Sequence, residues 1–136
     1  MFELTLSPRF YETDAFGHVN NTVMTGWFET GREPLFRIFQ GQRQDPGELP
    51  LILARVEVDF VAQTYYGQPV TLRTAIERLG NASFVVAQQA WQNGNLVARG
   101  KAVQVHFDHA TQASSPLPAS LREALEAHLE PLPETF

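Results

Sequence analysis

The second half of the chain is built from four long apolar runs, and this pattern constrains the fold more than any other. Each run is rich in valine, isoleucine, leucine or phenylalanine, and short turns containing glycine or asparagine separate them. Long strand-like segments joined by such turns predict an antiparallel meander. The four runs are Leu51–Thr64, Pro69–Leu79, Ser83–Gln92 and Leu96–Phe107.

The first third of the chain predicts one strand and one long helix. Apolar and polar residues alternate from Phe2 to Leu6, which is typical of a half-buried strand within residues 2–10. Apolar residues then recur at helical spacing over residues 22–40, with Asn20 or Asn21 as the N-cap. Pro34 lies inside this stretch. Because proline removes a helical hydrogen bond and clashes with the preceding turn, we expect a kink or a break there.

The whole order of elements predicts an α+β domain. Gly41 to Pro50 is expected to be a loop, residues 121–128 a short amphipathic helix, and the last eight residues loose. A long central helix would then pack on an antiparallel sheet of about five strands, in a single domain covering residues 1–136. One helix covers only one face of such a sheet. We therefore expect a homodimer or homotetramer, with the active site near the subunit interface.

Composition excludes several classes of protein. The net charge of −5 and the isoelectric point near 5.3 argue against a nucleic-acid partner. Cysteine is absent, so disulfides and thiolate chemistry are excluded. No apolar run approaches the ~18 residues that span a bilayer, and the beginning of the chain lacks the features of a signal peptide. We expect a soluble, cytoplasmic protein that has no membrane partner.

A polar segment between the first strand and the helix is the strongest candidate for chemistry. It places Asp14, Gly17, His18 and two asparagines just before the helix begins. The first turn of a helix offers unpaired N–H groups and the positive end of its dipole, which suit an oxyanion. A carboxylate beside them can act as general base or nucleophile. The same residues are also ordinary turn and cap formers, so spacing alone leaves both interpretations open.

This segment resembles the signature of the 4-hydroxybenzoyl-CoA thioesterase-like family of hot-dog-fold acyl-CoA thioesterases. The resemblance rests on Asp14-x-x-Gly17-His18-Val19-Asn20-Asn21, followed by Trp27 and Glu29. Further landmarks extend it over most of residues 3–127: Val56-Glu-Val-Asp59-Phe60, Tyr66-Gly67, Arg78-Leu-Gly-Asn-Ala-Ser83-Phe84 and Gly94 to Gly100. The resemblance implies a hot-dog fold, in which the sheet wraps the central helix. It also implies hydrolysis of an acyl-CoA thioester to a free acid and CoA, without a cofactor.

The resemblance assigns the catalytic carboxylate to Asp14, as general base or nucleophile. Backbone N–H groups around Gly17, His18 and Val19 could face the thioester oxygen, because glycine permits close approach. The His18 side chain could donate a hydrogen bond to that oxygen or orient a water, or it could simply cap the loop.

Six further residues are candidates for binding the substrate. Asn21 could hydrogen-bond the substrate, although helix capping explains it almost as well. Glu29 departs from the apolar stripe of the helix, and is either a second catalytic or water-binding group or the partner of an arginine. Arg55 and Arg78, together with Arg99 and Lys101, are candidates for the phosphates of CoA.

A metal site is the weaker interpretation of a second polar cluster. His106, Asp108 and His109 lie near the end of the last predicted strand. Their spacing does not match a structural zinc pattern. We expect a solvated strand end and no metal.

Two other functions compete with hydrolysis. A hot-dog enoyl-thioester dehydratase would need a histidine and a carboxylate that move protons at the α and β carbons. A noncatalytic acyl-thioester-binding protein would keep the pocket without needing Asp14. The His-Val-Asn-Asn run and the retained Asp14 favour hydrolysis.

Overall fold

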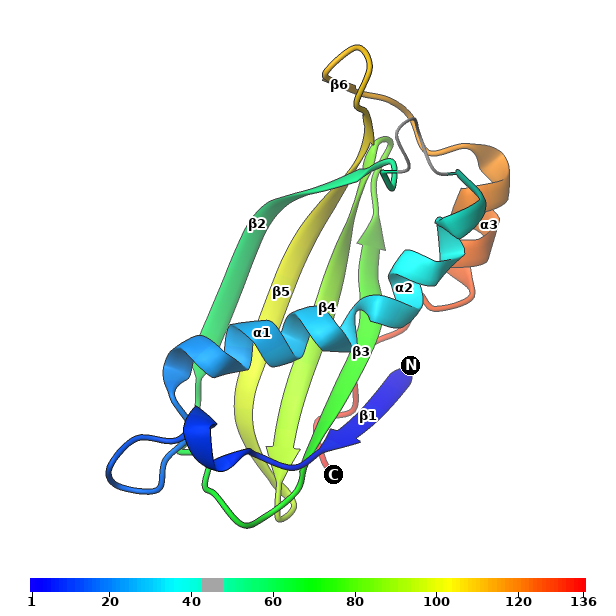
Figure 1. Cartoon of the computed structure of the whole chain (residues 1–136). Helices are drawn as coiled ribbons and strands as arrows, with labels where there is room; N and C mark the ends of the chain where they lie inside the picture. The colour runs from blue at the N-terminus through cyan, green and yellow to red at the C-terminus, as the bar shows by residue number, and fades with distance from the viewer. Residues whose placement is uncertain (43–47) are drawn as a thin grey trace.

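The computed structural model describes residues 1–42 and 48–136, and its main feature is a curved antiparallel sheet that wraps one long helix (Figure 1). Part of the loop expected at Gly41 to Pro50 lies outside the described residues. The strands run in the spatial order β1-β3-β4-β5-β2, and β6 pairs with the end of β5. Their bounds are β1 (Phe2–Leu6), β2 (Leu51–Phe60), β3 (Val70–Leu79), β4 (Ser83–Gln92), β5 (Asn95–Asp108) and β6 (Ala113–Ser114).

The predicted meander is confirmed for β3, β4 and β5 and is wrong for β2. β2 pairs with β5, so it forms the edge of the sheet instead of lying beside β3. The connection after β2 crosses the ends of two strands to reach β3. It is held there by the Gln92 side chain, which bonds the N–H and C=O of Tyr65 at 2.9 and 2.8 Å. Strand periodicity reveals which segments are extended, but not which neighbour each one pairs with.

The expected break in the long helix is confirmed. The structure has α1 (Asn21–Gly31) and α2 (Glu33–Ile38), separated at Arg32. Pro34 lies in the first turn of α2, where a missing N–H removes no intrahelical bond. The remaining helical segments are η1 (Phe10–Glu12), η2 (Gln40–Gln42) and α3 (Ala119–Glu126).

Helix α1 packs across the inner face of the sheet (Figure 1). Phe28 lies directly over Gly100, where a Cβ atom would stand 2.8 Å from the ring. Small residues under the helix therefore let the two elements approach closely. A second cluster joins α2 and α3 to the far end of the sheet, with the rings of Phe39 and Phe84 stacked at 5.9 Å.

A buried polar group fixes where α1 ends over the sheet. The Gln88 amide donates to the carbonyl of Phe28 at 2.8 Å and to the Thr74 hydroxyl at 3.0 Å. Its oxygen accepts a bond from the Arg32 guanidinium at 3.1 Å. Only 2% of Arg32 is exposed. This burial lowers the pKa of Arg32, while nearby Glu29 opposes the shift.

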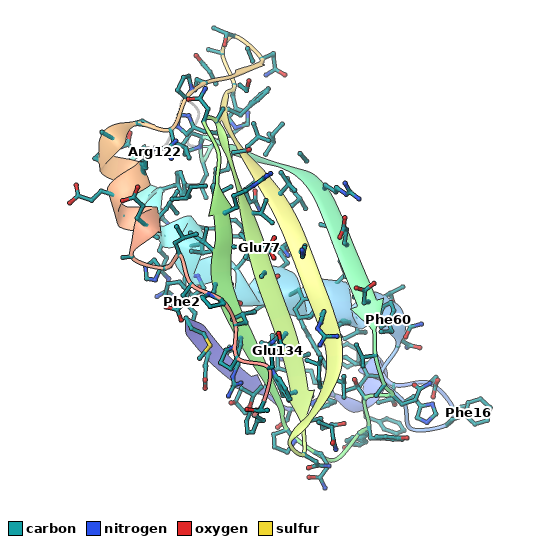
Figure 2. The ribbon with its side chains drawn as sticks, turned by 180° about the vertical axis from the view of Figure 1, so that it is seen from behind. Phe2, Phe16, Phe60, Glu77, Arg122 and Glu134 are labelled. Atoms are coloured by element: carbon teal, nitrogen blue, oxygen red, sulfur yellow. The ribbon has the colours of Figure 1, made fainter. Side chains whose placement is uncertain are left out.

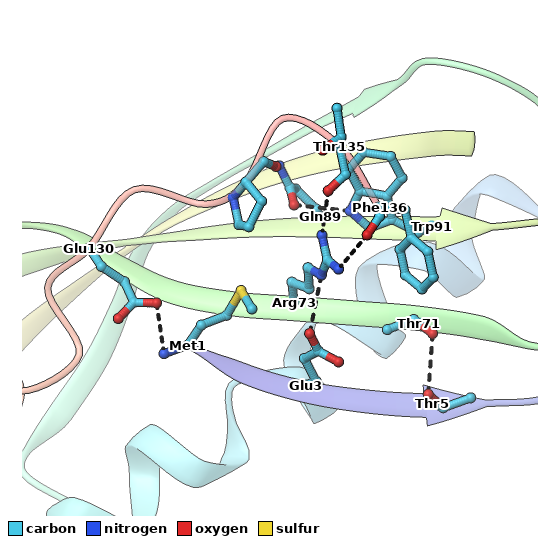
Figure 3. A network of polar contacts seen from close by, with 11 residues as sticks. Met1, Glu3, Thr5, Thr71, Arg73, Gln89, Trp91, Glu130, Thr135 and Phe136 are labelled. Atoms are coloured by element: carbon cyan, nitrogen blue, oxygen red, sulfur yellow. Dashed lines mark hydrogen bonds and ion pairs between the residues drawn. The ribbon is translucent and has the colours of Figure 1, made fainter. Parts of the chain in front are cut away.

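The last residues of the chain lie along the outer face of the sheet, so the expectation that they are loose is wrong (Figures 2 and 3). Arg73 donates to the carbonyl of Thr135 at 3.0 Å, and its guanidinium lies 4.7 Å from the ring centre of Phe136 and 5.5 Å from that of Trp91. The Gln89 amide donates to the carbonyl of Pro133 at 2.8 Å. Residues of β3 and β4 hold this segment in place. The composition of the segment itself does not reveal these partners.

Candidate functional site

The polar segment singled out in the sequence forms a small hairpin at the start of α1. Its closing contacts are a backbone bridge between Thr13 and Val19 and a bond from the Asn20 N–H to the carbonyl of Glu12 at 2.9 Å. Inside it, the Asp14 N–H donates to the carbonyl of His18 at 2.8 Å. The hairpin therefore has a defined backbone, although it is short.

A second set of contacts attaches this hairpin to the connection that follows β2. The Val19 N–H donates to the carbonyl of Thr64 at 2.7 Å, and the Tyr66 N–H donates to the carbonyl of Gly17 at 3.0 Å. His18 and Tyr65 form a further backbone bridge. The hairpin is thus held between the start of α1 and the end of β2.

The Asp14 side chain is exposed and forms a turn with the residues that follow it. Its Oδ1 atom accepts bonds from the N–H groups of Phe16 at 2.8 Å and His18 at 3.1 Å. Gly17 then adopts a φ of +78°, a conformation that favours glycine. These bonds orient the carboxylate. Within the described part of the chain, its Oδ2 atom has no partner, so one oxygen stays available.

The amides expected to face the thioester oxygen already have acceptors. The N–H of Gly17 donates to the carbonyl of Asp14, that of His18 to the Asp14 carboxylate, and that of Val19 to Thr64. The first turn of α1 differs. Asn20 is its N-cap but makes no capping bond through its side chain. Among the described residues, the N–H groups of Asn21 and Thr22 have no acceptor, so they are the donors that an oxyanion could use.

A small hollow lies beside this first turn. Residues from the hairpin, from α1 and from the end of β2 surround it, which brings Asn21 and Val19 together with the connection after β2. Its lining residues are Val19, Asn20, Asn21, Met24, Phe60, Ala62, Gln63 and Thr64.

Exposed aromatic side chains surround the hairpin, and sequence reasoning did not group them. The His18 ring meets Tyr65 edge-on at 5.1 Å between ring centres and lies 6.5 Å from Phe16. Phe16 is 82% exposed and projects from the end of the molecule (Figure 2). Phe10 and Tyr66 form a second exposed pair at 5.7 Å. These rings come from two loops about fifty residues apart, so no local pattern could have revealed them.

Glu29 stands apart from Asp14. It is exposed on α1, two turns after the helix begins. In the described residues it makes no hydrogen bond or ion pair with Asp14. Its resolved electrostatic effect is on Arg32, where burial lowers the pKa and the charge of Glu29 partly opposes that shift.

Glu12 is the residue of this region that the sequence interpretation missed. Its carboxylate accepts bonds from the Trp27 indole at 3.0 Å and from the Arg9 N–H at 2.7 Å. The three-residue separation of Arg9 and Glu12 is that of a capping box, which was a usable local signal. The contact with Trp27 had no such signal.

The predicted phosphate-binding residues lie on the outer face of the sheet, opposite α1. Arg55, Arg78 and Lys101 line one groove of about 440 Å³, together with Glu57 and Glu77. Arg55 pairs with Glu57 at 2.5 Å, and Lys101 with Glu77 at 3.1 Å. The structure therefore gathers three of the four cations, but not beside Asp14.

Arg99 belongs to a neighbouring groove on the same face. Its guanidinium lies 3.7 Å from the carboxylate of Glu134 in the last segment of the chain. That groove has a volume of about 480 Å³, and Lys101 lines it as well.

The second polar cluster of the sequence does not assemble as a metal centre within residues 1–42 and 48–136. The structure instead brings His106 to the hydroxyl of Ser115, at 2.9 Å from Nδ1. The carbonyl oxygen of Ser115 lies 3.0 Å from the same nitrogen. Because a carbonyl only accepts, we infer that Nδ1 carries the hydrogen. This nitrogen then cannot take a proton from Ser115, so the pair is structural.

Comparisons with known proteins show which family the chain resembles. A model of the thioesterase-like superfamily matches residues 8–125. The curated relative 1,4-dihydroxy-2-naphthoyl-CoA hydrolase of Synechococcus sp. (strain CC9605) is 31% identical over 133 residues, which cover 92% of this chain and 89% of that protein. In the part of the chain that the structure describes, no helix is long and apolar enough to cross a membrane.

Solved structures extend the likeness to the whole fold. One is described as "a predicted thioesterase from Bacillus stearothermophilus"; it is 40% identical, has a TM-score of 0.88, and the match covers 95% of this chain and 96% of that one. Another is a thioesterase from Thermus thermophilus in complex with coenzyme A and Zn, at 26% identity and a TM-score of 0.80, covering 96% of each chain. The predicted hot-dog fold is confirmed.

Proposed function

The chain belongs to the thioesterase-like superfamily, and on that basis we propose that Asp14 is the catalytic carboxylate in the hydrolysis of an acyl-CoA thioester. The chain is a thioester hydrolase, as the family match and the CoA hydrolase relative support. One observation carries the role of Asp14. Two backbone N–H groups orient its carboxylate, and it lies on a hairpin that leads directly into the first turn of α1, where two amides have no acceptor in the described residues.

The proposed reaction adds water across the thioester. Asp14 accepts a proton from water as the resulting hydroxide attacks the carbonyl carbon. The amides of Asn21 and Thr22 stabilise the oxyanion of the tetrahedral intermediate, and His18 donates a further hydrogen bond to it. The C–S bond then breaks, and the CoA thiolate leaves and is protonated. In the second route, the Asp14 carboxylate attacks the carbonyl carbon, the C–S bond breaks to expel the CoA thiolate, and water then hydrolyses the mixed anhydride to free acid and Asp14.

The remaining candidate residues take supporting roles. Gly17 supplies the left-handed backbone conformation of the turn that leads into His18, and Val19 lines the hollow beside the first turn of α1. Glu29 acts from the exposed side of α1 as a second group that can hold water. Arg55 and Arg78 meet the phosphates of CoA, because three cations share their groove.

An aromatic acyl group is the first substrate class to test. The relative from Synechococcus is named for an aromatic acyl-CoA, and exposed rings surround the hairpin in this chain. Stacked or edge-on contacts with such rings add to the energy of simple burial.

The working unit is at least a dimer. Strand β2 pairs with β5 on one side and has no partner strand on the other among the described residues. Ile52, Leu53, Val56 and Phe60 along it are exposed. A long apolar edge strand invites pairing with a second copy. Because the hairpin is attached at the end of β2, such pairing sets the active site near the interface. Light scattering on dilute protein tests this, and a fully active monomer would overturn it.

The function is tested with a panel of short, long, branched and aromatic acyl-CoAs, whose products are identified by mass spectrometry. We expect free acid and CoA from the wild-type protein. Asp14→Asn should lower turnover by about 10²- to 10⁴-fold, the usual contribution of a general base, and leave the fold intact. Release of a hydrated enoyl product would support a dehydratase instead, and binding without any product would support a carrier.

Asp108→Asn is the matched control. Asp108 also forms a turn, accepting bonds from the N–H groups of Ala110 at 2.9 Å and Thr111 at 3.4 Å. Asparagine can keep both turns, so only the variant that loses a reacting carboxylate should lose activity. If Asp14→Asn hydrolyses as well as Asp108→Asn, the assignment is wrong and Glu29 is tested next. A single turnover in ¹⁸O-labelled water labels the acid if water attacks directly, and the enzyme carboxylate if an anhydride forms.

A further inference from the structure

The carboxylate of Glu12 connects the hairpin to the side of α1. Oε2 accepts a bond from the Trp27 indole at 3.0 Å, and Oε1 accepts one from the Arg9 N–H at 2.7 Å. The carbonyl of Glu12 also accepts the bond from Asn20 that closes the hairpin. Glu12 therefore contacts the start of η1 just before the hairpin, the end of the hairpin and the helix.

The helix end of this connection is rigid. Trp27 is buried in the cluster that packs α1 on the sheet. A hydrogen bond to a carboxylate is stronger than one between neutral groups. Asp14 follows Glu12 by two residues, so a movement of the hairpin relative to α1 moves Asp14 relative to the first turn of that helix.

We propose that Glu12 is a positioning residue for thioester hydrolysis, which holds Asp14 in register with the first-turn amides of α1. This inference rests on the proposed role of Asp14. Glu12 itself touches no reacting atom. Its contribution is geometric, and a misplacement of about 1 Å in a reacting group can cost about 10²-fold in rate.

Glutamine cannot replace this carboxylate fully. Each oxygen of Glu12 accepts from a different N–H group. The glutamine side chain has one accepting oxygen, and its NH₂ group would face a second donor. Glu12→Gln thus breaks one of the two bonds while it keeps the size of the side chain.

The first experiment compares Glu12→Gln and Trp27→Phe with two matched variants. We expect kcat to fall by about 10- to 10²-fold in both, with little change in KM or in the melting temperature. Glu33→Gln removes an exposed carboxylate that pairs with Arg37, and Trp91→Phe removes an indole donor that bonds Gln89. Both matched variants should keep the wild-type kcat.

The double variant separates positioning from general weakening. Because Glu12 and Trp27 act through one shared bond, Glu12→Gln combined with Trp27→Phe should lower kcat no further than the stronger single change. Losses that multiply would mean that the two residues act independently, which would overturn the inference.

An NMR spectrum of the indole N–H groups tests the hydrogen bond between Trp27 and Glu12 without any substrate. The chain has two tryptophans, and each indole N–H has a different acceptor. Glu12→Gln should move the indole resonance of Trp27 and leave that of Trp91 unchanged. An unmoved Trp27 resonance would mean that the contact is absent in solution.

The outcomes distinguish this inference from the proposed function. Unchanged kcat in Glu12→Gln, together with an inactive Asp14→Asn, overturns the positioning role and leaves the proposed function standing. Full activity in Asp14→Asn overturns both. If Glu12→Gln does not fold, folded Trp27→Phe decides the question, and an unchanged kcat there overturns the inference.

Discussion

The two sides of the sheet hold their polar groups in opposite ways. On the inner side, the hairpin carries Asp14 to a helix start whose first amides have no acceptor in the described residues. On the outer face, cations and carboxylates already neutralise each other, as in the Lys101–Glu77 and Arg99–Glu134 pairs. Free backbone donors at a helix start are suited to stabilising an oxyanion, whereas exposed ion pairs contribute little energy and can exchange partners.

The packing of side chains also differs between the two sides. The inner side depends on glycine where Phe28 meets Gly100, so its packing has no spare volume. The outer face is covered in part by the last segment of the chain, which side chains such as Arg73 hold in place. Substitutions on the inner side should therefore change activity or core stability. Those on the outer face should act on the tail or on substrate affinity.

After Asp14, the largest effect on activity is expected at His18. A single donor to an oxyanion is worth about 10²- to 10³-fold in rate. Because His18 shares this task with two amides of α1, His18→Ala should lower kcat by about 10²-fold. His128→Ala is the control, since His128 packs on Phe2 with ring centres 4.4 Å apart, away from the hairpin. Equal kcat in the two variants would remove His18 from the mechanism.

Local sequence patterns predicted the elements of the fold and the segment that carries the candidate site. The strands, the break before Pro34 and the Asp14 segment follow from periodicity, proline geometry and a short motif. The pairing of β2 with β5 and the docking of the last residues were not predictable, because both depend on contacts between distant segments. The contact of Glu12 with Trp27 was missed for the same reason, since the two residues lie fifteen positions apart, although the spacing of Arg9 and Glu12 was a local signal.

The tight packing of the inner face is tested by Gly100→Ala. The added methyl group would meet the Phe28 ring at 2.8 Å, and Phe28 is 1% exposed and cannot move away. We expect a loss of about 3 kcal/mol in the free energy of unfolding, the upper end of the cost of overpacking. Denaturant unfolding measures it.

Gly26→Ala is the matched control on the solvent side of the same helix. Outside its own stretch of helix, no atom of the described residues lies within 4 Å of the position that its Cβ would occupy. Alanine should therefore stabilise α1 by about 0.8–1 kcal/mol through helix propensity. A similar loss in both variants would contradict the close contact of Phe28 with Gly100.

A smaller effect on stability is expected at Arg73 on the outer face. Arg73 is 7% exposed and lies against the rings of Trp91 and Phe136. Arg73→Lys keeps the charge but loses the planar group, which should cost about 1–2 kcal/mol and release the last segment. Hydrogen exchange of the Glu130 amide, which bonds the carbonyl of Ile76, measures the release. Arg37→Lys, in the exposed pair with Glu33, should change neither quantity, and kcat should stay constant in both.

The smallest effect is expected where the outer face would meet the phosphates of CoA. Lys101 contributes to both grooves of that face, and its ammonium group lies 3.1 Å from Glu77. An exposed ionic contact is worth about 0.2–1 kcal/mol, so Lys101→Ala should raise KM for an acyl-CoA by less than about fivefold. The rise should shrink as salt is added, because exposed charges are screened.

Arg37→Ala is the control, since it removes a paired cation from α2. A lower kcat in Lys101→Ala would contradict the contrast between the two sides of the sheet, because the outer face would then take part in the chemistry. If KM stays flat across ionic strength in the wild-type protein and in Lys101→Ala, the phosphates bind elsewhere, and the charges of the outer face serve only one another.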